Sequence, residues 1–381
     1  MNRDPDEIIA AWLEAGPSKI PEAPLQAVLV AVQSRPHAVR FSRRPAIFVG
    51  DRRREMAILA TVSIAVILAG TALLGLGEPR AGIGGPPSPR FPTSPSPTGA
   101  PSLDDLESHI SATIGPIQTP NSIGVGFGSV WVTTHTGGGL IRIDPATYST
   151  TWIALESVQV GNVLVFTSDS VWVGRGPGAY AEQVRLDPKT NRVTAVVPVS
   201  GRAAFGGGYV WTYNGQVLTQ IDAATARVVD QVRVTDPDPE TGVAFGRGSV
   251  WVATSQHGLF RVDPVSKKVL AQIDVSAWKV ASDGTEVWTV EEGRGVSRID
   301  TIRNRVAATV DIAGAVFPVV ANGLVWVTGD QGLTVLDATT AVITDELATG
   351  QTNYVGVGFG SVWVPKFHLN EVWRVDWPVS H

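Results

Sequence analysis

Gly126-Phe127-Gly128-Ser129-Val130-Trp131-Val132 is the stretch that decides the fold, because it returns in degraded form six more times along the chain. The returns occupy residues 170–173, 208–212, 248–252, 286–289, 324–327 and 358–364. Their central tryptophans follow one another at intervals of 41, 39, 40, 37, 38 and 37 residues. A period in this range indicates supersecondary units that stack or surround an axis.

Each repeat has the pattern of four short strands. In the first repeat, residues 123–127 predict a small-residue strand and residues 129–133 a β-branched and aromatic one, joined by a glycine turn. After a variable loop, residues 140–144 predict a third strand that ends in aspartate, and residues 150–155 predict an outer strand. Such a blade buries both faces only between neighbouring blades. The sequence therefore predicts an all-β fold, a seven-bladed β-propeller over residues 103–381.

The two ends of the repeat region favour a closed ring over a linear solenoid. After Asp376 only five residues remain, too few for the last outer strand. Residues 109–114, ahead of the first repeat, resemble the outer strands predicted at 269–275 and 306–312. We expect this N-terminal strand to complete the seventh blade and close the ring, which also hides the edges of the sheets.

Three segments precede the propeller. Residues 56–77 are 22 residues without a charge, and a helix of that length reaches about 33 Å, enough to span a bilayer core of about 30 Å. Seven arginines lie between residues 35 and 54, just upstream, which predicts a cytoplasmic N-terminus. We expect residues 1–55 to be a cytoplasmic leader of two short helices and a basic tail, and the Pro/Gly/Ser-rich residues 78–102 to be a stalk. A cleaved signal peptide is the alternative, although its apolar region usually has about 7 to 15 residues.

Charge and composition exclude several classes of function. Residues 1–100 contain 11 Lys and Arg against 8 Asp and Glu, whereas residues 101–381 contain 19 against 27. An acidic propeller is not expected to bind nucleic acid. The chain has no cysteine, so disulfides, thiolate metal sites and a cysteine nucleophile are excluded.

Three kinds of repeated residue have a structural interpretation. The repeat tryptophans lie in the middle of the second strand, which predicts packing between neighbouring blades. The aspartates that end the third strands predict turn capping rather than calcium binding, because equivalent positions on separate blades diverge. These are Asp144, Asp187, Asp222, Asp263, Asp300, Asp337 and Asp376. The arginines two residues earlier are expected to be strand-face partners: Arg142, Arg185, Arg261, Arg298 and Arg374.

The candidate binding residues lie on one face of the predicted ring. In a propeller, the loops between the second and third strands and the connections between blades share a face, which we call the loop face. Loops carry function on a rigid scaffold, so polar residues there are the candidate ligand site. They are His135, Arg175, Tyr213, Asn214, His257, Glu291, Glu292, Arg294, Asp330 and His368, with Tyr180, Asp236, Asp238, Glu240, Asn353 and Tyr354 on the same face. Repeats 1 and 7 adjoin, so we expect His135 and His368 to approach each other and His257 to lie across the ring. Solvated loop positions explain these histidines better than a metal site does.

The repeat resembles a known group of bacterial propellers. Gly-x-Gly-Ser-Val-Trp-Val, followed by Leu-x-Arg-Ile-Asp-Pro-x-Thr and Val-x-x-x-Ile, is similar to YVTN-type and virginiamycin B (streptogramin) lyase-like repeats. In the lyases the resemblance implies histidine, glutamate and Mg, which eliminate across an ester. Trp288-Thr289-Val290-Glu291, followed by Gly295-Val296-Ser297-Arg298-Ile299, comes nearest to the lyase pattern, while other units lack the glutamate.

The predicted function is binding. We expect a single-pass membrane protein with an extracytoplasmic propeller that binds a small molecule, glycan or protein through its loop face, without a cofactor or a bound metal. The cytoplasmic leader makes a sensory role a further hypothesis. The alternative is a metal-assisted lyase or hydrolase that uses Glu291, Glu292 and His135 or His368.

Overall fold

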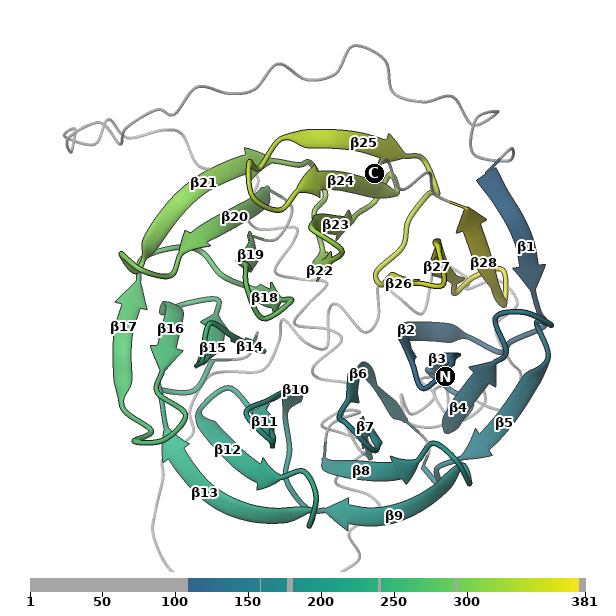
Figure 1. The fold of residues 1–381 in the computed structure, drawn as a ribbon, viewed down its shortest axis with the longest axis horizontal. Helices are drawn as coiled ribbons and strands as arrows, with labels where there is room; N and C mark the ends of the chain where they lie inside the picture. Colours follow the sequence, from purple (N-terminus) through teal and green to yellow (C-terminus); the bar gives the residue numbers. More distant parts are fainter. Residues whose placement is uncertain (1–108, 158, 177–180, 239–240, 292–293, 377–381) are drawn as a thin grey trace, which may run out of the picture. The chain divides into compact units, whose positions relative to one another are not determined.

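The structure is a computed structural model that describes residues 109–376, except residues 158, 177–180, 239–240 and 292–293. The described residues form seven four-stranded antiparallel sheets around a central axis (Figure 1). The predicted all-β, seven-bladed propeller is confirmed. The predicted leader, membrane helix and stalk, residues 1–55, 56–77 and 78–102, lie outside the described residues. In the part of the chain that the structure describes, no helix is both long and apolar enough to cross a membrane.

Blades 1 to 4 follow one another along the chain, each with its strands in order from the axis outward. Blade 1 consists of β2 (Pro120–Gly126), β3 (Ser129–Thr134), β4 (Gly139–Ile143) and β5 (Thr150–Ala154). Blade 2 consists of β6 (Val160–Phe166), β7 (Val171–Arg175), β8 (Glu182–Asp187) and β9 (Arg192–Val197). Blade 3 consists of β10 (Arg202–Gly206), β11 (Tyr209–Tyr213), β12 (Val217–Asp222) and β13 (Arg227–Arg233). Blade 4 consists of β14 (Thr241–Gly246), β15 (Ser249–Thr254), β16 (Gly258–Val262) and β17 (Val269–Ile273).

Blades 5 to 7 complete the ring, and the last one takes its outer strand from the N-terminal side. Blade 5 consists of β18 (Lys279–Ser282), β19 (Val287–Glu291), β20 (Gly295–Asp300) and β21 (Arg305–Asp311). Blade 6 consists of β22 (Phe317–Ala321), β23 (Leu324–Thr328), β24 (Leu333–Asp337) and β25 (Ile343–Leu347). Blade 7 consists of β26 (Gly356–Gly358), β27 (Ser361–Lys366), β28 (Glu371–Asp376) and β1 (Ile110–Ile114).

The ring is closed by the strand that the sequence predicted. β1 pairs antiparallel with β28, with Thr113 opposite Trp373 and Ile114 opposite Val372. Ile114 is 5% exposed and packs in the core between blades 7 and 1. The seventh sheet is therefore made from both ends of the repeat region. The predicted N-terminal closing strand is confirmed, and we call it the clasp.

The repeat tryptophans form the core between blades, as predicted. All seven indoles are at most 2% exposed. Trp131 of blade 1 packs against Val171 and Val173 of blade 2, and Trp363 of blade 7 packs against Val130 of blade 1. Each large apolar ring thus fills the space between its own blade and the next one.

The aspartates cap the turns that join the third and fourth strands in six of the seven blades. Asp144 Oδ1 accepts hydrogen bonds from the backbone N–H groups of Ala146, at 2.9 Å, and Thr147, at 2.8 Å. These bonds hold the pKa of the carboxyl below its ordinary value. The turn prediction stays untested for Asp376, because residues 377–381 lie outside the described residues and β1 supplies the outer strand of blade 7. Asp376 accepts a bond from Ser361 Oγ at 3.0 Å.

Three of the arginines two residues before the aspartates, Arg142, Arg261 and Arg374, also reach the next blade, beyond the predicted strand-face pairing. Arg142 donates from Nε to Ser129 Oγ at 2.8 Å, and its guanidinium lies over the Trp131 ring. Its Nη1 also reaches blade 2, where it donates to Pro188 O at 2.6 Å and Asn191 Oδ1 at 3.0 Å. The guanidinium therefore links two blades, which long planar donors do well.

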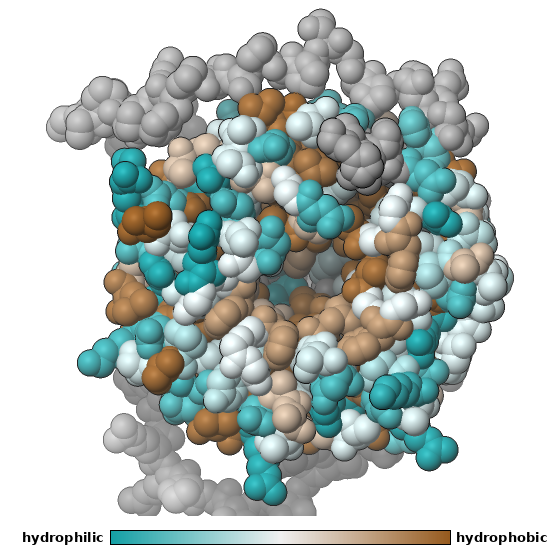
Figure 2. Space-filling model, in the orientation of Figure 1, coloured by the Kyte–Doolittle hydropathy of each residue, from teal (hydrophilic) through white to brown (hydrophobic). Residues whose placement is uncertain are grey.

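The axis of the propeller is apolar where the inner strands approach one another. A cavity of about 260 Å³ lies there, with Val125, Leu164, Val319 and Val357 in its wall. Figure 2 shows apolar residues gathered around the hollow at the centre of the ring. The axis therefore offers few polar groups, whereas the loop face carries the polar candidates.

Candidate functional site

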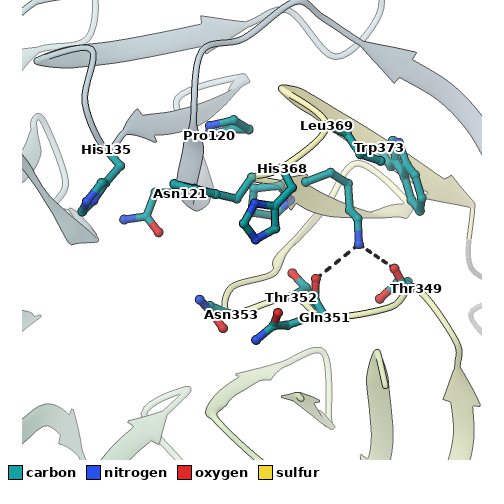
Figure 3. Close-up of a pocket in the computed structure, with 13 residues that line it drawn as sticks. Pro120, Asn121, His135, Thr349, Gln351, Thr352, Asn353, His368, Leu369 and Trp373 are labelled. Atoms are coloured by element: carbon teal, nitrogen blue, oxygen red, sulfur yellow. Dashed lines mark hydrogen bonds between the residues drawn. The ribbon is translucent and has the colours of Figure 1, made fainter. Parts of the chain in front are cut away.

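A cavity of about 680 Å³ opens at the seam between blades 6, 7 and 1 (Figure 3). Trp373 of β28 and four segments form its wall: the start of β2 with Asn121, the blade 1 loop with His135, the connection between blades 6 and 7, and the end of β27 with the loop that follows it. The size lies in the usual range for a small-molecule site, about 300 to 1,000 Å³. All four segments belong to the loop face.

Hydrogen bonds across the seam hold the blade 1 side of this cavity in place. Ile117 N donates to Asn370 O at 2.7 Å, and Thr119 N donates to Asn370 Oδ1 at 2.9 Å. His135 N donates in turn to Thr119 O at 3.0 Å. The connection from the clasp strand to β2 therefore ties the blade 7 loop to the blade 1 loop, so ring closure and site formation depend on the same segment.

His135 and His368 each pack against the ring of Phe367, which lies between them in this chain of aromatic contacts. The His135 and Phe367 ring centroids are 5.9 Å apart, and those of Phe367 and His368 are 5.1 Å apart, both with edge-on geometry. Both histidines are exposed. Edge-on aromatic pairs of this spacing are favourable, and they leave the ring faces free to contact a ligand.

Lys366 is a buried cation beneath the cavity. It is 8% exposed, and its Nζ donates to Thr349 O at 2.5 Å and Gln351 O at 3.3 Å. The ammonium lies 4.9 Å from the centre of the Trp373 ring. Burial lowers the pKa of Lys366. Because these bonds fix two carbonyls of the connection between blades 6 and 7, Lys366 positions that wall of the cavity.

Amide side chains supply most of the neutral polar groups of the cavity. Asn121 comes from the blade 1 side, and Gln351 and Asn353 come from the connection between blades 6 and 7 (Figure 3). Among the described residues that line the cavity there is no aspartate or glutamate, although residues 101–381 carry an excess of 8 acidic groups (27 against 19). Amides both donate and accept hydrogen bonds, so this wall suits hydroxyl, amide or carbonyl groups of a ligand.

Several predicted site residues instead hold loops together on blades 2 to 4. The hydroxyl of Tyr213 is buried and bonds Thr235 Oγ1 at 2.7 Å, and burial raises its pKa. Asn214 Oδ1 accepts two backbone N–H groups of its own hairpin. Arg175 donates to Glu182 Oε1 at 2.7 Å, and His257 lies in the blade 4 loop away from the cavity. None of these four residues lines the seam cavity.

The acidic candidates are not gathered with the histidines. Glu291 ends β19 of blade 5 and accepts a hydrogen bond from Arg294 Nη1 at 2.6 Å. Asp330 is exposed in the blade 6 loop, and Glu292 lies outside the described residues. Within the described ranges, no group of three or more His, Asp and Glu side chains is placed to hold a metal ion. The structure brings together His135, His368 and Asn353, but not the glutamates.

Sequence reasoning missed Asn121, Gln351, Lys366, Phe367 and Trp373. Trp373 falls outside the repeat pattern of tryptophans, and a lysine at the end of β27 replaces the residues that end other second strands, such as Thr134 and Thr254. Both departures from the repeat lie in blade 7, and they are the sequence features that could have pointed to the cavity.

Comparison with known proteins identifies the fold. No family model matches the chain, and no curated protein matches it, so the likeness to YVTN-type and virginiamycin B lyase-like repeats stays a resemblance. Among solved structures 1407 chains match, so likeness to them defines architecture rather than activity. One is the crystal structure of BamB from Moraxella catarrhalis, with 14% identity and a TM-score of 0.52, covering 69% of this chain and 85% of that chain. This chain is a β-propeller that shares its architecture with many others.

Proposed function

We propose that the protein is a membrane-anchored, extracytoplasmic binding module whose ligand site is the seam cavity, the cavity between blades 6, 7 and 1. The ligand class that fits is a neutral glycan. The main support is the lining of the seam cavity, which combines three amides with aromatic rings and contains no carboxylate among the described residues.

The chemistry of a sugar matches this lining. Each sugar hydroxyl both donates and accepts, as do the amides of Asn121, Gln351 and Asn353. The C–H faces of a sugar ring are apolar and pack on aromatic faces, here those of His368 and Phe367. The cavity is large and fixed by the ring, so little ordering is needed when a ligand binds.

The membrane anchor and the outward location rest on the uncharged residues 56–77 and the arginines before them. Their test is the accessibility of the propeller to protease in intact cells. Digestion in intact cells is expected, whereas protection until the cells are opened would contradict the location.

The binding site is tested with the propeller fragment, residues 103–381, which contains every strand of the ring. An array of neutral oligosaccharides is the first probe, and calorimetric titration of the oligosaccharides retained is the second. Asn353→Ala and His368→Ala are expected to weaken binding by at least about tenfold, since each removes a direct contact. His257→Ala, a loop histidine outside the cavity, is the matched control. Equal binding by all three variants would refute the site. Failure to retain any oligosaccharide would refute the ligand class.

A further inference from the structure

The face opposite the loop face has two unusual turn tips. We call it the Asp-turn face, because it carries the six aspartate-capped turns. Val265 and Ile302, at the tips of the turns of blades 4 and 5, are 85% and 87% exposed. The equivalent positions in the other blades are small or polar: Ala146, Lys189, Ala224 and Thr339. Scattered exposed apolar residues are ordinary, but here two large ones stand at the same turn position of neighbouring blades. We call these two turn tips together the protrusion.

Positive charge surrounds these two tips. Residues 261–268 and 298–305 together contain six Lys and Arg and two Asp and Glu, whereas residues 101–381 as a whole contain 19 and 27. Lys268 and Arg305 are exposed, and the Arg303 side chain is 68% exposed. The protrusion is therefore a basic region on an acidic domain.

A hollow of about 310 Å³ adjoins Ile302. Arg247 from the blade 4 hairpin and Arg303 from the blade 5 turn both line it, together with Arg298 and two carboxylates. Arg247 lies 3.9 Å from Glu286 and Arg303 lies 3.0 Å from Asp300, so each arginine has one acidic neighbour. The Arg247 side chain is 53% exposed, so both guanidinium groups are accessible to an anion that approaches with the apolar tips. Arginine binds phosphate oxygens with several donors at once.

The two turns are held in a fixed relation. Arg261 of β16 donates from Nη1 to Thr301 O at 2.7 Å and to Asn304 Oδ1 at 3.0 Å. These two hydrogen bonds hold the blade 5 turn against blade 4. Lys267 Nζ donates to Pro264 O at 2.6 Å within the blade 4 turn. The apolar tips are thus presented on rigid turns, which need no ordering when they dock.

The chain also joins the ring on this face. Ile110 at the start of β1 lies opposite Val375 near the end of β28, where other blades have the aspartate-capped turn. β1 therefore begins at the Asp-turn face, and the seam cavity is on the other face.

We propose that the Asp-turn face of blades 4 and 5 docks onto an anionic membrane surface. Val265 and Ile302 enter the boundary between headgroups and acyl chains, while Arg247, Lys268 and Arg303 contact lipid phosphates. Such binding grows with the apolar area inserted and with attraction between basic residues and anionic lipids. It leaves the loop face turned toward the solvent.

The test is sedimentation of the propeller fragment, residues 103–381, with vesicles. It is expected to pellet with vesicles of phosphatidylcholine and 30% phosphatidylglycerol, to remain soluble with pure phosphatidylcholine, and to be released by salt because exposed charges are screened. The Val265→Ser/Ile302→Ser variant and the Lys268→Glu/Arg303→Glu variant are each expected to lose roughly tenfold or more of this affinity. Val228→Ser/Val229→Ser, which changes exposed valines of β13 on the outer wall, is the matched control.

Two results would overturn the proposal. One is equal pelleting of the wild type and both tip variants when their melting curves agree. The other is absence of pelleting with a melting shift in inorganic phosphate, which would mean that the hollow binds a soluble anion. Neither result depends on the ligand of the seam cavity.

Discussion

Arg374 of blade 7 donates from Nη1 to the phenolic oxygen of Tyr148 on blade 1 at 2.8 Å, across 226 residues of sequence. The same guanidinium donates from Nε to Ser361 Oγ at 2.8 Å and lies over the Trp363 ring. It repeats at the seam the link that Arg142 makes between blades 1 and 2. The closure of the ring therefore depends on a side-chain bond as well as on the clasp strand.

Tyr148→Phe is expected to lower the free energy of unfolding by about 0.5–1.5 kcal/mol, because it removes one hydrogen bond without changing the packed ring. Urea denaturation of the propeller measures this change. Arg303→Lys, in an exposed pair with Asp300, is the control and should change stability by less than about 0.5 kcal/mol. An unchanged midpoint for Tyr148→Phe would show that the bond contributes nothing in solution.

Removal of the clasp should damage the fold far more. A fragment that begins at Gly115 lacks β1 and exposes β28 and part of the core that Ile114 fills. We expect it to melt at least about 10 °C lower than residues 103–381, since several kcal/mol of burial and strand pairing are lost. Thermal unfolding followed by circular dichroism tests this. Equal melting temperatures would mean that the ring closes without its seventh outer strand.

Acid should destabilise the propeller through its turns. Hydrogen bonds hold the pKa values of Asp187, Asp263 and Asp300 below the ordinary 3.8. The folded state therefore binds fewer protons than the unfolded state near that pH. The stabilisation is complete above pH 3.8 and is lost as the pH falls through the lowered folded values. Replacement of the three by Asn should flatten the fall in stability that acid causes below pH 3.8. A triple variant with the wild-type slope would contradict this assignment.

Lys366→Met should loosen the wall of the seam cavity. The change leaves two carbonyl groups, those of Thr349 and Gln351, without the ammonium that bonds them. We expect a loss of about 1–3 kcal/mol in stability and faster amide exchange in the connection between blades 6 and 7. Lys189→Met, at an exposed turn tip, is the control. Unchanged exchange in that connection would show that Lys366 does not position it.

The repeat pattern was sufficient for the fold because its signals are local and recur seven times. Each tryptophan-centred second strand, the aspartate turns of six blades and the spare strand predicted at residues 109–114 could be read from spacing alone. The site is different, because it lies where the repeat is interrupted. The chain segments that carry Asn121 and Asn353 are far apart in sequence, and only the closure of the ring brings them into one wall. Tyr213 looked available from its loop position, but its burial depends on the neighbouring turn.

The seam could in principle lie in any blade, because its position depends only on where the chain enters and leaves the ring. Since Ile110 begins beside the end of β28, a short aspartate turn copied from another blade can join the two. A circularly permuted chain that starts at β2 and ends with β1 would then contain seven blades of identical connectivity. The permuted chain would form the same ring, but no blade would combine strands from its two ends. A comparison of the unfolding rates and stabilities of the permuted and natural chains would separate the effect of topology on the unfolding rate from the effect of the contacts on stability.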